Sequence, residues 1–356
     1  MNNQMDLMCE ELKDSKFPTI VWGGLMSAKI GNFFNNKKIP FAGFAVNQTF
    51  YNKNEVKDYP FYCIEEYVEN NKCNIVVGFS KYNDSMLELL KKENIVKVYK
   101  VDFWGRFPVG CDDTVWTESF VKNNNSKLNK IRRWLCDEKS KVAFDDFCNQ
   151  KQTCCFSKKY DETPQYFDSS IIKYTENEFF IDCGAYRGES SLEFIKQLRI
   201  NGITEFKKIL VLEPDSNNFI YAKDNLKKYK NIEIIPCGVG KYNAELCFSN
   251  NGTTSARFMD NGGISVSVKK IDDIAFNCDV TFIKMDIEGM ELEALEGGSE
   301  IICRCKPKLA ICVYHKADDI IRISEYIKEL NPNYKLYLRN YNFTATETVL
   351  YAINKE

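Results

Sequence analysis

The chain has 356 residues, of which 44% are hydrophobic and 28% charged, and its formal net charge is −2. This length suits two ordinary domains, and the near-neutral charge gives no electrostatic reason to expect nucleic acid or an anionic membrane as a partner. The chain contains no apolar run of about 18 residues, and its acidic first residues differ from a signal peptide, so we expect a cytoplasmic protein without a membrane span.

The cysteines number 15, but no two of them have the C-x-x-C spacing, and the chain has a single histidine. A zinc site is therefore not expected. Several cysteines lie inside apolar stretches. We interpret them as reduced thiols that serve as small apolar residues.

The first hundred residues alternate between strand-like and helix-like segments. Apolar runs predict strands at 19–23, 41–47, 74–80 and 96–103, and helical spacing predicts helices at 27–36, 64–71 and 83–94. This alternation predicts a small parallel, Rossmann-like α/β domain over residues 1–103. Residues 104–175 read as a helical linker, whose bends are marked by proline and asparagine clusters.

Strand and helix alternate again over residues 176–356, which we assign to a second domain. Its predicted strands lie at 179–184, 207–214, 231–239, 279–289 and 307–315, and helices follow most of them. Residues 244–249 and 264–272 read as added strands or a hairpin. Two closing strands at 334–341 and 346–353 are separated by only a few residues, so we expect an antiparallel hairpin.

A glycine turn follows the first strand of this second domain. Gly184-Ala-Tyr-Arg-Gly188 lacks the middle glycine that the G-x-G-x-x-G fingerprint uses to approach a pyrophosphate. A cofactor with ribose and adenine but no phosphate, such as S-adenosylmethionine (SAM), fits this turn. Glu213 ends the next strand, where a carboxylate can accept hydrogen bonds from both ribose hydroxyls.

Five stretches in order resemble the FkbM family of SAM-dependent methyltransferases. They are QYFDSSIIKYTENEFFIDCGAYRGES, VLEPDSNNF, IKMDIEGMELEALEGG, LAICVYHKADDI and ETVLYAI, and the resemblance covers about residues 165–353. It implies a class I methyltransferase fold, a seven-stranded and mostly parallel sheet with an antiparallel strand near one edge. It also implies SAM as cofactor and O-methylation, often of sugars or natural-product hydroxyls.

The resemblance also assigns residues to the cofactor site. Its first motif matches Asp182, Gly184, Ala185 and Gly188, and Glu213 matches the ribose-binding acid. We add the neighbouring positions Tyr186, Pro214, Asp215, Cys237 and Asp286 to this site. Arg187 is a departure, since family members often carry Asp or Asn there, and it can change contacts at the rim of the turn.

Methyl transfer to a hydroxyl needs alignment, exclusion of water and a base. Three candidate bases stand at strand ends: His315, Asp286 and Glu288, and we add Lys284 from the same strand to the catalytic candidates. Each has a structural alternative. His315 can bond a backbone carbonyl, the two acids can cap a helix, and Lys284 can form an ion pair. The two carboxylates could also take a divalent ion, but one short acidic motif does not make a metal site, and we predict none.

The first domain also has a strand–glycine–helix segment, VWGGLMSAKIGNFF, but it lacks the dinucleotide fingerprint and the next strand ends without an acid. We interpret this domain as structural, with dimerisation or substrate presentation as its task. The polar stretch 250–258 is either a hairpin connection or a loop that meets the cofactor or a sugar.

Together these patterns predict a SAM-dependent O-methyltransferase that acts on a sugar, a nucleotide sugar or a related metabolite, without nucleic acid or a membrane span and with a homo-oligomer as one option. Two alternatives stay open. One is a non-catalytic binding or assembly module that retains the fold, and the other is an NAD-linked oxidoreductase that uses the first domain.

Overall fold

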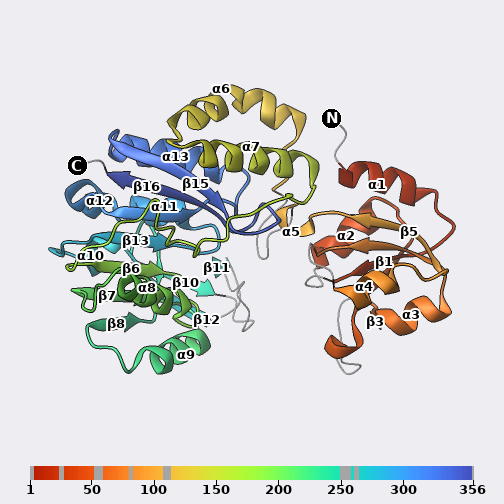
Figure 1. Ribbon diagram of the computed structural model, residues 1–356, viewed down its shortest axis with the longest axis horizontal. Coiled ribbons are helices and arrows are strands. Elements are labelled where there is room, and N and C mark those ends of the chain that lie inside the picture. The colour runs from red at the N-terminus through yellow and green to blue at the C-terminus, as the bar shows by residue number, and fades with distance from the viewer. Residues whose placement is uncertain are drawn as a thin grey trace.

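The computed structural model describes residues 4–23, 28–51, 59–79, 83–106, 114–248, 258–259 and 264–354. The N-terminal sheet lies at the right of Figure 1, and the larger C-terminal half lies at the left with helices α6 and α7 above it. None of the described helices has both the length and the apolar character that crossing a membrane requires.

Five parallel strands form the N-terminal sheet in the order β3-β2-β1-β4-β5. They are β1 (Thr19–Trp22), β2 (Phe41–Val46), β3 (Phe61–Cys63), β4 (Cys73–Val77) and β5 (Ile95–Lys100). Every residue of β1 and β4 is buried, which explains why both read as continuous apolar runs. The sequence predicts four of these strands, and the short β3 is the addition.

Helices flank this sheet, and one of them is absent from the sequence-based expectation. They are α1 (Gln4–Lys13), α2 (Ala28–Asn36), α3 (Ile64–Asn70) and α4 (Asp84–Leu89), with the short η1 (Gln48–Phe50) and α5 (Phe103–Arg106) after β2 and β5. The unpredicted helix is α1. Its buried side chains Met5, Met8, Cys9 and Leu12 follow the spacing of one helical face and pack into the N-terminal core.

The two long helices α6 (Glu118–Trp134) and α7 (Glu138–Thr153) belong to the C-terminal core, so the predicted linker role is wrong for them. Thr117 and Asp137 cap their first turns. Their apolar faces, with Ile131 and Phe147 fully buried, join the same core as the large sheet. Figure 1 shows α7 lying along β15, because an apolar helix face is stable only when it is covered.

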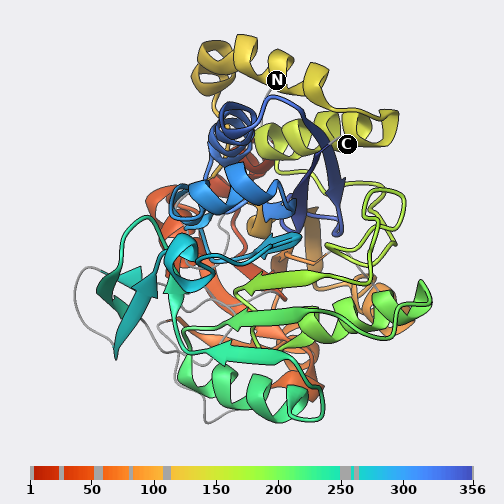
Figure 2. The same cartoon turned by 90° about the vertical axis from the view of Figure 1, so that its left-hand side faces the viewer.

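The second sheet has seven strands in the order β15-β16-β14-β13-β6-β7-β8. They are β6 (Phe179–Cys183), β7 (Lys208–Leu212), β8 (Ile232–Ile235), β13 (Phe282–Met285), β14 (Lys308–Cys312), β15 (Tyr334–Asn340) and β16 (Thr348–Asn354). Strand β16 pairs antiparallel with both β14 and β15, the other pairs are parallel, and β15 and β16 form the predicted hairpin. This arrangement confirms the class I methyltransferase sheet that the resemblance implies. In Figure 2 the green strands β6 to β8 lie below the blue strands β15 and β16.

Helices connect these strands, and a small second sheet follows β8. The helices are α8 (Glu189–Ile200), α9 (Ser216–Leu226), α10 (Ile271–Ile274), α11 (Glu291–Glu296), α12 (Ser299–Cys305) and α13 (Asp319–Leu330). The small sheet contains β9 (Gly238–Val239), β10 (Ala244–Phe248), β11 (Phe258–Met259) and β12 (Ile264–Lys269). As predicted, β10 and β12 pair antiparallel. Apart from Phe258, the predicted polar loop 250–258 lies outside the described residues.

The strand order reverses beside β6, because β7 and β8 lie on one side of it and β13 and β14 on the other. In open α/β sheets, ligands bind beyond the carboxyl ends of the strands at such a reversal. The candidate site therefore lies where β6 and β13 end.

A buried arginine ties the preceding segments to the hairpin. The guanidinium of Arg339 on β15 donates to Asp168 Oδ2 at 2.9 Å and to Asp137 Oδ2 at 2.8 Å, and its Nε lies 3.3 Å from Asp161 Oδ2. Arg339 is only 2% exposed. This network joins the start of α7 and the segment before β6 to the edge of the sheet.

Candidate active site at the ends of β6 and β13

The glycine turn after β6 requires glycine at its first position. Gly184 has φ +76°, and a Cβ placed on it would lie 1.9 Å from the backbone oxygen of Asp286. The turn is closed by a hydrogen bond from Gly188 N to Ala185 O at 2.8 Å. The absence of a side chain therefore lets the glycine turn touch the end of β13 directly.

Glu213 fastens the end of β7 to this turn. Its carboxylate accepts hydrogen bonds from the backbone N–H of Tyr186 at 2.8 Å and of Asp215 at 2.9 Å, one on each oxygen. Burial raises the pKa of Glu213 to about 7, although these two bonds oppose the shift. Because each carboxylate oxygen can accept more than one hydrogen bond, Glu213 can hold the turn and still accept from hydroxyl groups.

Two predicted site residues lie beneath the turn instead of facing a ligand. Asp182 is fully buried and accepts hydrogen bonds from the hydroxyls of Ser190 and Ser191, both at 2.6 Å. Lys284 is 2% exposed, lies 3.3 Å from Asp182 Oδ1 and donates to Gly184 O at 2.7 Å. These contacts give both residues a supporting place beneath the turn, and the cofactor contact of Asp182 and the catalytic role of Lys284 stay predictions. Both side chains support the backbone of the turn from inside.

The other predicted cofactor residues surround the same edge of the sheet. Asp215 caps α9 by accepting from the N–H of Asn217 and Asn218, which occupies its Oδ1, and Pro214 precedes it directly. Cys237 follows β8 and is 1% exposed, so its thiol has little surface to offer. Arg187 stacks its guanidinium on the rings of Tyr186 and Tyr221, 5.0 and 4.6 Å from their centroids, at the rim of the turn.

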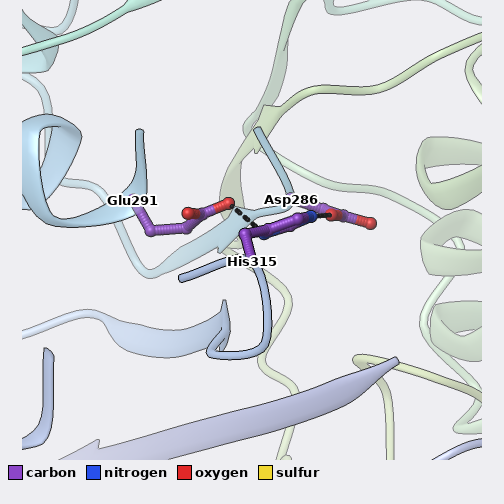
Figure 3. A group of neighbouring side chains, drawn as sticks. All are labelled: Asp286, Glu291 and His315. Atoms are coloured by element: carbon purple, nitrogen blue, oxygen red, sulfur yellow. Dashed lines mark ion pairs between the residues drawn. The ribbon is translucent and has the colours of Figure 1, made fainter. Parts of the chain in front are cut away.

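The predicted catalytic acids and His315 come together beside this turn. Asp286 directly follows β13, Glu288 lies two residues later, and His315 lies three residues after the end of β14. The imidazole Nε2 lies 3.5 Å from Asp286 Oδ1 and 3.7 Å from Glu288 Oε2. The other ring nitrogen, Nδ1, lies 3.0 Å from Oε1 of Glu291, the first residue of α11. Figure 3 shows the imidazole with Glu291 on one side and Asp286 on the other.

These carboxylates decide the charge of His315. Burial by itself would lower the pKa of His315, but Glu291, Glu288 and Asp286 overcome that effect and hold the pKa well above its usual value. A protonated imidazole has no free lone pair. The surrounding charges thus favour the protonated imidazole in the ligand-free protein, which weighs against the predicted role of His315 as the base.

The two predicted acids differ in their surroundings. Burial favours a raised pKa for Asp286, but Lys284 and His315 outweigh it and keep the pKa below its usual value. Burial, joined by the charge of Asp286, raises the pKa of Glu288 to about 8. The helix-capping alternative does not describe either acid, because it is Glu291 that accepts from the N–H of Ile287 at 2.9 Å.

Several residues of the site escape the sequence analysis because they come from distant segments. The hydroxyl of Tyr166 donates to Asp286 Oδ2 at 2.7 Å, and that of Tyr314 donates to Asp286 Oδ1 at 3.3 Å. Gln165 donates to Glu347 Oε2 at 2.6 Å. Tyr166 and Gln165 lie in the first stretch that carries the family resemblance, which is the one available signal for them.

Unusual backbone geometry gathers around this site. The non-glycine residues with positive φ include Tyr166 at 68°, Tyr186 at 51°, Glu288 at 57° and Glu347 at 62°. Such conformations cost of order 1–3 kcal/mol each and persist where surrounding packing enforces them. The fold thus fixes these four positions at the site rather than leaving them free to relax.

Glycines of the N-terminal domain are already packed against aromatic rings. A Cβ on Gly23 would lie 2.2 Å from the ring of Phe79, and one on Gly31 would lie 2.3 Å from the ring of Tyr59. At both positions the close approach that a glycine allows is used by a side chain of the same domain. This packing supports a structural interpretation of the VWGG segment over a dinucleotide site.

Residues 182–344 match the methyltransferase FkbM domain. The chain carries a methyltransferase domain of the FkbM type over these residues. This match includes the glycine turn, Glu213 and the Asp286–His315 cluster, and it confirms the resemblance seen in the sequence. No curated protein is a significant match for the chain.

Solved structures resemble this chain to different extents. The methyltransferase FkbM from Methylobacillus flagellatus is 21% identical, with a TM-score of 0.71, over 99% of this chain and 94% of that one. This likeness extends the shared fold to the N-terminal sheet. An rRNA methylase from Streptococcus thermophilus is 16% identical, with a TM-score of 0.33, over 51% of this chain and 87% of that one. The Aeropyrum pernix fibrillarin, determined with bound SAM, is 9% identical, with a TM-score of 0.30, over 52% of this chain and 70% of that one.

SAM is the cofactor of this family, and the residues present fit it. Glu213, 5% exposed at the end of β7, offers a carboxylate for the ribose hydroxyls. The turn from Gly184 to Gly188 offers backbone atoms without the phosphate-binding middle glycine. Asp286 lies against this turn, which places the acid–histidine cluster next to the cofactor end of the sheet.

Proposed function

We propose that this FkbM methyltransferase transfers the methyl group of SAM to a hydroxyl of a sugar, a nucleotide sugar or a related metabolite. The observation that carries the proposal is the contact between the glycine turn and the acid cluster, since a Cβ on Gly184 would meet the backbone oxygen of Asp286 at 1.9 Å. A hydroxyl must lose its proton as it is methylated, so carboxylates beside the cofactor turn suit an oxygen acceptor.

SAM supplies an electrophilic methyl group, and the chain has to align the acceptor and receive its proton. Glu288 is suited to receive that proton in its ionised form, because a carboxylate with a pKa of about 8 is a stronger base than an ordinary one. Its side chain is 25% exposed, and no hydrogen-bond donor reaches its carboxylate within the described part of the chain. Its backbone has a φ of +57°, a strained conformation that the surrounding packing enforces. Asp286 is held by the hydroxyls of Tyr166 and Tyr314, so it can accept a hydrogen bond from the acceptor in a defined orientation.

A polyhydroxylated acceptor matches the polar atoms of this cluster. Carboxylate oxygens accept hydrogen bonds from neighbouring hydroxyls, and Asp286, Glu288 and Glu347 supply such oxygens at the edge of one sheet. This chemistry supports a sugar ring over an apolar acceptor.

The test is a turnover assay with methyl-labelled SAM and a panel of sugars and nucleotide sugars. We expect S-adenosylhomocysteine and a product whose labelled methyl resonates as a methyl ether in the NMR spectrum. Glu288→Gln should lower kcat by about 100-fold or more while leaving S-adenosylhomocysteine affinity intact. The matched control is Glu296→Gln, whose carboxylate pairs with Lys241 at 3.4 Å, and it should turn over normally. A labelled methyl found on nitrogen or sulfur, or binding without turnover of any acceptor, would contradict the proposal.

A further inference from the structure

His315 directs one ring nitrogen toward two carboxylates without bonding either of them. The side chain is 2% exposed, yet Nε2 lies 3.5 Å from Asp286 Oδ1 and 3.7 Å from Glu288 Oε2. Both separations exceed an ordinary hydrogen bond. Within the described residues, a buried imidazole nitrogen thus faces two carboxylate oxygens, and neither lies at an ordinary hydrogen-bond distance from it.

The opposite nitrogen of the same ring faces a buried carboxylate. Nδ1 lies 3.0 Å from Glu291 Oε1, and Glu291 is fully buried at the start of α11 (Figure 3). Glu291 is itself fixed, because its Oε1 accepts from the N–H of Ile287 at 2.9 Å. A carboxylate this close to Nδ1 favours the tautomer that carries its proton on Nδ1 and its lone pair on Nε2, and metal-binding histidines are commonly oriented in this way.

The distances around Nε2 are those of atoms that share a metal ion. Ligand atoms bound to one ion at about 2.1 Å in a tetrahedral arrangement are about 3.4 Å apart. The two distances from Nε2, 3.5 and 3.7 Å, lie within a few tenths of an ångström of that value. The same aspartate and histidine form a second group with Glu291, in which the ligand atoms all lie within 4.8 Å of one another.

The cluster is also accessible and oriented for an ion. The side chains of Asp286 and Glu288 are 24% and 25% exposed, so an ion has a path to them although the imidazole is buried. The hydroxyl of Tyr166 holds the second oxygen of Asp286 at 2.7 Å, which leaves Oδ1 directed toward His315. Such outer contacts are typical of metal sites, where they orient the ligands.

We propose that Asp286, Glu288 and His315 bind a divalent transition-metal ion, with Glu291 as the residue that positions the imidazole. One imidazole nitrogen with two carboxylate oxygens suits ions of the Zn²⁺ or Co²⁺ type better than Ca²⁺, which prefers oxygen ligands alone. This site goes beyond the proposed function and departs from the sequence-based expectation of no metal. A bound ion would leave open positions for an acceptor hydroxyl and would favour its loss of a proton.

The test is an absorption titration of the full-length, chelator-treated protein with Co²⁺, in the absence of SAM and acceptor. We expect one Co²⁺ per chain and visible bands of a site with nitrogen and oxygen ligands. Glu288→Gln should weaken Co²⁺ binding at least tenfold, and His315→Gln should remove the visible bands, whereas Glu296→Gln should bind like the wild type. Glu288→Gln is the decisive variant because its side chain is partly exposed, and thermal unfolding checks that each variant is folded.

Three results would overturn the cation site: no binding below millimolar Co²⁺, full affinity in folded Glu288→Gln, or only the near-ultraviolet bands of cysteine coordination. The binding readout is independent of methyl transfer. Co²⁺ binding without turnover of any hydroxyl acceptor would defeat the proposed function alone. O-methylation by a protein that binds no metal would defeat the cation site alone.

Discussion

Replacing Glu213 by alanine tests the assignment of the cofactor site. The carboxylate is 5% exposed and accepts from two backbone N–H groups, those of Tyr186 and Asp215. In the bound state it would also accept from ribose hydroxyls, and a hydrogen bond to a charged group is worth about 1.5–3 kcal/mol. Losing one or two such bonds should weaken cofactor binding by about 2–4 kcal/mol, which is roughly 30- to 1000-fold.

The assay is calorimetric titration with S-adenosylhomocysteine, together with urea unfolding of the ligand-free protein. Glu213→Ala also leaves two backbone N–H groups without their partner, so we expect a loss of folding free energy of about 1–3 kcal/mol for each one that water does not reach. The control is Glu233→Ala on β8, whose carboxylate is 53% exposed and pairs with Lys208. Glu233→Ala should change neither the binding free energy of S-adenosylhomocysteine nor the free energy of unfolding by more than about 0.5 kcal/mol. Wild-type affinity in a folded Glu213→Ala protein would refute this reasoning.

Three further results are expected. Burial raises the pKa of Glu213 to about 7 in the ligand-free protein, and only the ionised carboxylate accepts from both ribose hydroxyls. The affinity for S-adenosylhomocysteine should therefore fall as the pH drops below 7 and level off above it. Calorimetry across pH 5.5 to 8.5 checks this, and Glu213→Ala should lose that dependence. Gly184→Ala should lower the free energy of unfolding by more than about 2 kcal/mol, because it adds a steric clash with Asp286 to an unfavourable φ of +76°. Gly202 has a similar φ of +78°, but a Cβ on it would meet no atom within 4 Å. Urea unfolding of Gly202→Ala should therefore show only the loss that comes from the unfavourable backbone conformation. Arg339→Met should lower the free energy of unfolding by about 3–5 kcal/mol, because it leaves Asp168, 1% exposed, as an uncompensated buried charge. A loss below about 1 kcal/mol in urea unfolding would count against this explanation.

The elements that the sequence predicts are those whose signal is local. Strands β6, β7, β13 and β14 are short apolar runs, and each site residue that ends or follows one of them, such as Glu213, is placed by chain position alone. Helix α1 shows that the same kind of signal can be overlooked, because the spacing of Met5, Met8, Cys9 and Leu12 is helical although the segment is rich in acids.

Tertiary packing decided the roles of the site residues. Asp286 lies 120 positions from Tyr166 in the chain and 28 from Tyr314, and only the folded sheet brings both hydroxyls to its carboxylate. Burial makes Asp182 and Lys284 supports of the glycine turn, although their sequence positions are those of ligand contacts. These outcomes depend on burial and on charges summed over distant segments, which no local pattern contains.

The sequence by itself determined the alternating α/β class, the glycine turn and the acid at the end of β7, because each is encoded within a few consecutive residues. The three-dimensional structure decided that α6 and α7 cover the large sheet and that His315 stands between Glu291 and the Asp286–Glu288 pair. These contacts form only when segments from the whole chain pack together, because apolar faces must be buried and buried charges must be paired.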